Sequence, residues 1–149
     1  MLLYSVILSF KLLFFAPVSA EWGLDIEKAK QEASSTQKYI LLNFCGSDWC
    51  GPCIKLKKDI FESEDFQEYA SKNLVLIRAD FPRLKKNQLD KKQTAHNEAL
   101  AEKYNPEGKF PLTLLLDANG NVVREWDGYT QKSGLDFAHE IHALTHASK

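Results

Sequence analysis

The feature that most constrains this chain is a pair of cysteines placed shortly after an apolar run. Residues 39–44 are apolar except for Asn43, and a short polar turn separates them from Cys50 and Cys53. Such a run is typical of a central strand covered on both faces. A helical pattern then continues to Phe61, which predicts that Cys50 lies at the N-terminus of a helix.

A cysteine at the start of a helix has a distinct chemistry. Free N–H groups and the positive end of the helix dipole stabilise an anion there, so the thiolate form of Cys50 is favoured. Cys53 follows one turn later, where a disulfide to Cys50 can close. Pro52 lies in the first turn, where its missing N–H costs the helix nothing. The spacing therefore predicts a reversible dithiol–disulfide pair in which Cys50 attacks and Cys53 resolves.

Two structural roles compete with this interpretation. A zinc site needs a second Cys-x-x-Cys or a histidine pair at ligand spacing, and the sequence offers only Cys45 besides the pair. A static crosslink within one helical turn closes a very short loop, so it would stabilise the fold little. Redox work is the better interpretation of the two cysteines.

The string Trp-Cys-Gly-Pro-Cys at residues 49–53, placed after an apolar strand, resembles the active site of thioredoxin. The longer string Gly-Ser-Asp-Trp-Cys at residues 46–50 resembles a branch of exported, periplasmic bacterial thioredoxin-like proteins with a Gly-Ser-Asp-Trp-Cys-Gly-x-Cys motif. The resemblance extends from about Trp22 to Leu144.

Periodicity alone predicts an α/β protein, and the resemblance adds the topology. It implies a thioredoxin fold, in which a mixed central sheet is flanked by helices on both faces, with an extra helix at the N-terminus. Strands are expected at residues 39–44, 74–79, 112–116 and 122–126. Helices are expected at 25–37, 50–61, 94–104 and from Ser133, where Ser133 and Asp136 resemble a capping box. A capped turn is expected after Ser63.

The resemblance also implies a substrate groove around the cysteines, formed by Trp49, Gly51, Pro52, Phe110 and Pro111. Pro111 matches the family's cis-proline, and a substrate segment would pair with the backbone of Phe110 as an added strand. The family usually has a smaller residue before this proline. Trp49 could instead be simply a core aromatic.

Two residues are expected to tune the pair. By the resemblance, the position of Asn43 matches a buried aspartate of thioredoxin, which helps to move the proton of the resolving thiol. The amide of Asn43 cannot accept that proton. The basic partner expected on the next strand is replaced by Leu76, so the acid–base pair is missing as a unit. Asp48 is a candidate substitute base, although its turn position predicts a solvated side chain.

Three other features allow more than one interpretation. Cys45 is a small buried residue, a regulatory thiol, or a third partner in disulfide exchange. The basic segment 81–94 is a docking rim or a solvated surface. The C-terminal histidines form a solvated face, or a metal pair at His142 and His146; we expect no metal site.

The N-terminus resembles a secretory signal. Residues 2–15 are mostly apolar, Pro17 follows, and Val18-Ser19-Ala20 fits a cleavage site. The run is short for a membrane span, although an uncleaved anchor is the alternative. The expected organisation is a signal peptide at 1–20 and a thioredoxin-like domain at 21–149, located in the periplasm or secreted.

Composition and motif together define the expected function. A length of 149 residues suits one domain, and a net charge of −1 gives no general attraction to nucleic acid or anionic membranes. We expect a monomeric thiol–disulfide oxidoreductase without a bound cofactor, acting on cysteine-containing proteins in cell redox homeostasis. Gly51-Pro52 resembles the reducing members of the family, which implies a membrane or periplasmic thiol–disulfide electron donor. The alternatives are a binding or chaperone module for exported cysteine-containing clients, and a carrier of a soft metal ion.

Overall fold

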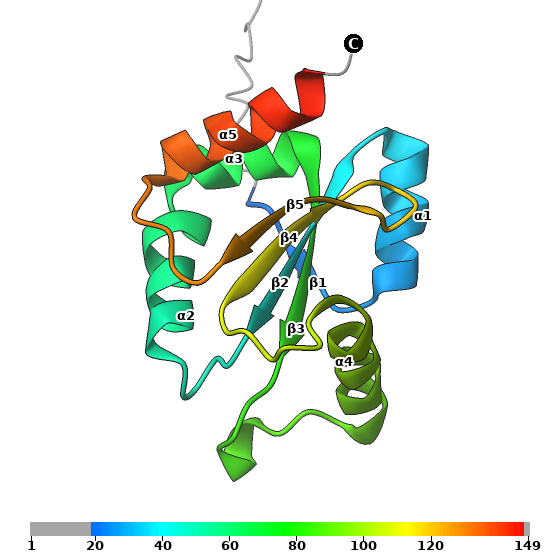
Figure 1. Ribbon diagram of the computed structural model, residues 1–149, viewed down its shortest axis with the longest axis vertical. Helices are drawn as coiled ribbons and strands as arrows, with labels where there is room; N and C mark the ends of the chain where they lie inside the picture. The colour runs from blue at the N-terminus through cyan, green and yellow to red at the C-terminus, as the bar shows by residue number, and fades with distance from the viewer. Residues whose placement is uncertain (1–18, 148–149) are drawn as a thin grey trace, which may run out of the picture.

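The structure, a computed structural model, describes residues 19–147. A five-stranded sheet in the order β1-β3-β2-β4-β5 runs through the middle of the molecule (Figure 1). Strands β1, β3 and β2 are parallel, and β4 and β5 are antiparallel to their neighbours. The strands are β1 (Trp22–Gly23), β2 (Tyr39–Cys45), β3 (Leu74–Asp80), β4 (Leu112–Leu116) and β5 (Val122–Asp127).

Helices cover both faces of this sheet. One face packs against α1 and α4, and the other against α2, α3 and α5 (Figure 1). The helical elements are α1 (Ile26–Thr36), α2 (Gly51–Leu56), the π-helical η1 (Lys57–Phe61), α3 (Glu64–Asn73), the 3₁₀ turn η2 (Lys85–Asn87), α4 (Lys91–Tyr104) and α5 (Gly134–His146). The expected thioredoxin fold with its mixed sheet is therefore confirmed.

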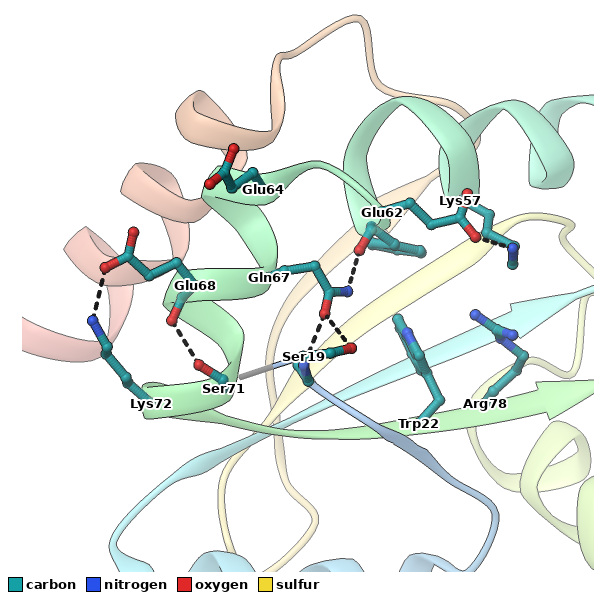
Figure 2. Close-up of a pocket in the computed structure, with 12 residues that line it drawn as sticks. Ser19, Trp22, Lys57, Glu62, Glu64, Gln67, Glu68, Ser71, Lys72 and Arg78 are labelled. Atoms are coloured by element: carbon teal, nitrogen blue, oxygen red, sulfur yellow. Dashed lines mark hydrogen bonds and ion pairs between the residues drawn. The ribbon is translucent and has the colours of Figure 1, made fainter. Parts of the chain in front are cut away.

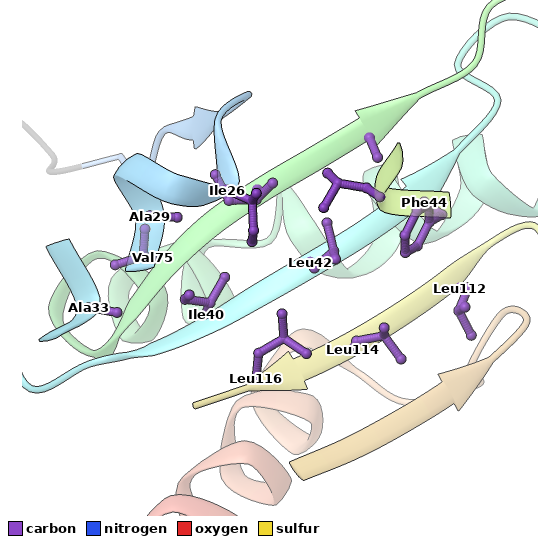
Figure 3. Packing of buried hydrophobic residues seen from close by; sticks show 13 residues of the cluster. Ile26, Ala29, Ala33, Ile40, Leu42, Phe44, Val75, Leu112, Leu114 and Leu116 are labelled. Carbon is purple, nitrogen blue, oxygen red and sulfur yellow. The ribbon is translucent and has the colours of Figure 1, made fainter. Parts of the chain in front are cut away.

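The two hydrophobic clusters follow from the alternation of side chains along the central strands. Ile40, Leu42 and Phe44 of β2 point toward α1 and α4 (Figure 3), while Leu41 points into the cluster under α3 and α5. Because successive strand residues face opposite sides of a sheet, one continuous apolar run fills both cores. The same rule places Leu115 opposite its neighbours in β4.

Helix starts agree with their capping signals. Ser133 Oγ accepts from the N–H of Asp136 at 3.1 Å and also bonds the Asp136 carboxylate, which confirms that expected pair. Asp25, Ser63 and Asp90 cap the starts of α1, α3 and α4. These side chains satisfy N–H groups that have no partner inside the helix.

Several sequence expectations need correction. The short strand β1 was not expected, and the turn after Ser63 is a full helix, α3. Helix α4 begins at Lys91 rather than Thr94, and it exposes Ala95 while burying Asn97. The side chain of Asn97 donates to the carbonyl of Asp80 at the end of β3, so a polar contact joins α4 to the sheet.

The predicted signal peptide lies almost wholly outside the described residues. Within residues 19–147, none of the helices has the length and apolar character needed to cross a membrane.

Candidate active site

The two cysteines of the motif form a disulfide at the start of α2. Their Cα atoms are 5.2 Å apart, and Cys50 is the N-cap residue of the helix. Its sulfur accepts from the N–H of Cys53 at 3.3 Å, while Gly51 and Pro52 between them are exposed. After reduction, the same N–H and the helix dipole would stabilise a thiolate on Cys50.

Exposure does not distinguish the two sulfur-bearing residues, because Cys50 is 4% and Cys53 5% exposed. Their surroundings do distinguish them. Cys53 lines a pocket of about 230 Å³ together with the buried Asn43 and Cys45 and the exposed Ile54 and Lys57, whereas Cys50 does not line it. Cys53 is thus the member of the pair that borders this pocket.

On its outer side, the disulfide is bordered by Phe110 and Trp49. The Phe110–Pro111 peptide bond is cis, as expected from the family, and the rings of Phe110 and Trp49 meet edge to face at 5.4 Å. Within residues 19–147, neither the backbone N–H nor the C=O of Phe110 has a hydrogen-bond partner, whereas the carbonyl of Pro111 accepts from Gly128. The backbone of Phe110 is therefore available to an added strand.

Trp49 is only partly buried and packs against the cysteines, so it forms a wall of the active-site surface rather than part of the core. Its Nε1 donates to the carbonyl of Phe81 at 2.7 Å, and the guanidinium of Arg83 lies 3.7 Å from the centre of its ring. A side chain at Gly46 would approach the indole within 2.2 Å, so the close contact requires glycine there.

Asp48 anchors the segment that follows β3. Its carboxylate accepts from the N–H groups of Arg83 and Leu84, both at 2.9 Å, and from the side chain of Asn87 at 3.0 Å. The bond from the Arg83 N–H is the main cause that holds the pKa of Asp48 below its ordinary value. Asp48 does not line the cavity beside Cys53, so the structure gives it an anchoring contact instead of contact with the resolving thiol.

Asn43 lies on the inner side of the disulfide and is 3% exposed. Its Nδ2 donates to Thr113 Oγ1 at 3.1 Å and is 3.4 Å from the carbonyl oxygen of Leu112. The residue opposite Asn43 on β3 is Arg78 and not Leu76, which pairs with Leu41. The expectation that no basic residue stands next to Asn43 is therefore wrong; a slip in strand register caused the error.

Two cationic side chains line the pocket beside Cys53. Lys57 and Arg78 line both the small cavity beside Cys53 and a larger one of about 680 Å³ between η1, α3 and the β1 edge (Figure 2). Figure 2 shows Arg78 beside Trp22, whose ring lies 4.7 Å below the guanidinium, and Lys57 directed to Glu62. The pocket beside Cys53 is thus lined by the guanidinium of Arg78 and by Lys57, whose charge is paired with Glu62.

Cys45 is a buried, protonated thiol. Its Sγ lies 3.5 Å from Asp80 Oδ1, and the same carboxylate accepts from the N–H and hydroxyl of Ser47. Burial in the first place, and the negative charge of Asp80 in the second, raise the pKa of Cys45 to about 12. A thiol is a poor nucleophile compared with a thiolate, so this geometry disfavours Cys45 as a third partner in exchange.

The C-terminal histidines lie on the exposed side of α5. The rings of His142 and His146 stack at 3.9 Å, and His146 Nδ1 is 3.0 Å from the carbonyl oxygen of His142. Among the described residues there is no cluster of three or more His, Cys, Asp or Glu side chains that could hold a metal ion.

Comparison with known proteins identifies the family. A family model of a thioredoxin-like domain matches residues 26–143. The chain belongs to the thioredoxin-like family. It is 34% identical over 126 residues to the disulfide bond reductase DsbH of Chlamydia pneumoniae, a match that covers 85% of this chain and 73% of DsbH. It is 31% identical over 123 residues to the thioredoxin-related protein DsbJ of the same organism, covering 83% of this chain and 34% of DsbJ.

Solved structures agree. A DsbH oxidoreductase superposes with a TM-score of 0.79 at 26% identity, covering 95% of this chain and 94% of the other. A disulphide isomerase from Xylella fastidiosa Temecula1 has a TM-score of 0.59 at 18% identity and shares the fold. With its Cys50–Cys53 pair, this member of the family is a thiol–disulfide oxidoreductase.

Sequence analysis missed several residues at the site. Arg78 interrupts the apolar strand 74–79, and a charge inside such a run is a signal that could have been followed. Phe81 and Arg83 belong to the basic segment 81–94, for which a docking rim was one interpretation. Their contacts with the active-site turn, and that of Asp80, gave no signal because they join positions more than 30 residues apart.

Proposed function

We propose that the protein reduces disulfide bonds in cysteine-containing proteins outside the cytoplasm, with Cys50 as nucleophile and Cys53 as resolving thiol. The observation that carries the proposal is the disulfide itself, with one cysteine at a helix N-cap and the other beside a separate pocket. The relative named disulfide bond reductase supports the reducing direction, as does the Gly51-Pro52 pair between the cysteines.

The reaction has two exchanges. The Cys50 thiolate attacks a substrate disulfide, so the substrate S–S bond breaks, a Cys50–substrate disulfide forms and one substrate thiolate leaves. The Cys53 thiolate then attacks Cys50, which closes the Cys50–Cys53 disulfide and releases the second substrate thiolate. The two substrate thiolates take up protons, and two electrons have passed from the protein to the substrate. A dithiol donor, membrane-bound or periplasmic, reverses this to regenerate the reduced pair.

The substrate would lie along the outer side of the pair. Its backbone would bond the open N–H and C=O of Phe110, while Trp49 and Pro111 form the walls next to the exposed Gly51-Pro52 turn. Since the electrons travel through the cysteines themselves, the reaction needs no bound cofactor, and the monomer carries the whole site.

The second exchange proceeds here without a buried carboxylate. The amide of Asn43 cannot accept the proton of Cys53, but Arg78 and Lys57 line the same cavity. A positive charge near a thiol favours its thiolate. Lys57 is paired with Glu62, so Arg78 is the cation that favours the Cys53 thiolate, and the proton leaves through water.

The proposed location outside the cytoplasm is based on residues 1–20, which resemble a secretory signal. Cleavage after Ala20 would start the mature chain at Glu21 and give a domain of 21–149. N-terminal sequencing of the exported protein tests this, and an intact Met1 on a membrane-bound form would point to an anchor instead.

The decisive measurement is the equilibrium of the Cys50–Cys53 pair with a series of glutathione redox buffers. A reductant should have a potential of about −230 mV or below, as thioredoxin does, whereas a value near about −120 mV would mark an oxidant and overturn the direction. A Cys50→Ser/Cys53→Ser variant is the control for exchange at Cys45. If that variant kept the full biological activity, a binding module would replace the enzyme.

A further inference from the structure

The segment between β3 and α4 is bound tightly to the active-site turn. Asp48 accepts from the backbone of Arg83 and Leu84, and the indole of Trp49 donates to the carbonyl of Phe81. Trp49, which directly precedes the nucleophile Cys50, and Asp48, which precedes Trp49, thus each bind the segment. Its position is therefore fixed relative to Cys50.

A cavity of about 500 Å³ lies between this segment, α4 and the active-site surface. Its apolar lining includes Phe81, Pro82, Leu89 and the two rings of Trp49 and Phe110. The ring of Phe110 meets those of Trp49 and Phe81 edge to face, at 5.4 Å and 5.5 Å. Phe110 borders both this cavity and the disulfide, so the cavity is a direct continuation of the groove that receives the reacting cysteine.

One cation, Arg83, lines this cavity, and two lysines follow it in the segment. Arg83 covers Trp49, and Lys85 and Lys86 are exposed on the next turn; among the described residues, none of these three takes part in an ion pair. Two acidic residues also line the cavity. The carboxylate of Asp80 keeps its charge but is directed to Ser47 and Cys45, and Glu98 is the second opposing charge.

From this arrangement we infer a substrate-selecting subsite, which we name the insertion subsite: Phe81, Pro82, Arg83, Leu89 and the outer edges of Trp49 and Phe110. Its occupant is the extended segment of the substrate protein that flanks the reacting cysteine. An apolar side chain enters the cavity and an acidic one meets Arg83. The inference rests on the proposed disulfide exchange, but it holds for either direction of electron flow.

The proposed chemistry follows from the two parts of the subsite. Aromatic walls favour an apolar side chain that leaves water. An unpaired guanidinium held over an indole offers its N–H groups to a carboxylate, and a row of exposed cations speeds the approach of an acidic chain. Discrimination by charge at an exposed rim weakens as salt rises.

The test uses short peptides in which one cysteine is joined by a disulfide to thionitrobenzoate, so that attack by Cys50 releases a coloured thiolate. Three peptides carry a leucine and a pair of glutamates, glutamines or lysines next to the cysteine, on either side of it. The amide of N-acetylcysteine, joined in the same way, has no flanking residues and reports the bare exchange reaction.

With the reduced wild-type protein, the glutamate peptide should react about 5- to 10-fold faster than the lysine peptide at low salt, and the difference should shrink at high salt. Arg83→Ala should reduce this ratio to below about twofold. Lys92→Ala is the matched control, because it removes a cation from the same basic stretch but lines a different cavity. It should keep the wild-type ratio.

The outcomes separate the two proposals. No reaction with the N-acetylcysteine amide would overturn the exchange chemistry itself. Normal reaction with that amide, but equal rates for the three peptides, would overturn the insertion subsite alone. A ratio that survives Arg83→Ala would also overturn it. Replacing the leucine of the peptide by glycine should slow the wild-type protein, and an unchanged rate would overturn the apolar part.

Discussion

The outer and inner sides of the Cys50–Cys53 disulfide are held by different kinds of contact. On the outer side, Asp48 and Trp49 make polar and cation–π contacts with a partly exposed segment that lies more than 30 residues away in the chain. On the inner side, Asn43 and Cys45 are buried, neutral residues of the central strand β2. Substitutions on the outer side of the disulfide should therefore alter which substrates react. Substitutions on the inner side should alter the protonation of buried groups and the stability of the fold.

The largest effect is expected from the two cysteines themselves. Cys50→Ser should reduce turnover of a protein disulfide by about a thousandfold or more, because the nucleophile is lost. Cys53→Ser should instead accumulate a stable Cys50–substrate disulfide, visible by mass spectrometry of the unreduced protein. A substrate adduct on Cys45 in either variant would contradict the assignment.

The next effect concerns Cys45 on the inner side. Its pKa is raised from 9.0 to about 12 in the folded state, so between these values the folded protein keeps a proton that the unfolded chain releases. The stabilisation is complete below pH 9 and falls by about 1.4 kcal/mol per pH unit above it. Urea melts from pH 8 to pH 10, in a Cys50→Ser/Cys53→Ser background that prevents disulfide exchange, should show this slope.

Cys45→Ala in the same background is the comparison, since it leaves all other titrating groups in place. Its free energy of unfolding should fall less steeply with pH than that of the parent. Parallel slopes would mean that Cys45 titrates alike in the folded and unfolded chains.

A smaller effect is expected from Asn43→Asp. Burial should raise the pKa of the new carboxyl, so the folded state binds its proton more tightly than the unfolded chain does. Stability is then unaffected below about pH 4 and declines as pH rises toward the folded pKa, after which it is constant. The new carboxylate should also speed attack by Cys53, measured as the decay of a Cys50 mixed disulfide.

Arg78 decides how large that decline becomes. It pairs with position 43 across the strands, so its charge should offset part of the burial of the new carboxylate. Adding Arg78→Met to Asn43→Asp should therefore steepen the loss of stability with pH. An equal loss in the single and double variants would show that Arg78 does not act on this position.

The smallest effect is expected on the outer side. Asp48→Asn removes the negative charge of the carboxylate to which the Arg83 and Leu84 N–H groups donate. The segment between β3 and α4 should then become more mobile without unfolding of the domain. Limited digestion with trypsin should then cut at Arg83, Lys85 or Lys86 severalfold faster, while the melting curve changes little. Lys72→Ala, on the distant helix α3, should digest at this segment as the parent does.

The individual strands and helices could be predicted from the sequence because their signals are local, whereas the topology came from the resemblance to thioredoxin. The apolar run 39–44, the cap at Ser133 and the string at 49–53 each lie within a few residues, and each was confirmed as structure. Strand register was the weak point, since a shift of two positions replaces Arg78 by Leu76 opposite Asn43. A shift by two keeps every side chain on its own face, so the apolar pattern cannot exclude it.

The outer side of the site was harder to predict. Asp48 has the appearance of a solvated turn residue, and only the folded chain brings Arg83 and Leu84 to its carboxylate. The cavity of the insertion subsite likewise depends on the packing of α4 against the segment between β3 and α4. No sequence pattern indicates that packing.

The contact of Asp80 with Ser47 and Cys45 has one more consequence, for the kinetics of exchange. It fixes the turn that leads to Cys50 to the end of a central strand, so the attacking sulfur has little freedom left to lose when it enters the transition state. The activation entropy of the reaction then belongs mainly to the substrate. Flexible client chains, which must be ordered to present their disulfide, should differ from rigid ones more in activation entropy than in activation enthalpy.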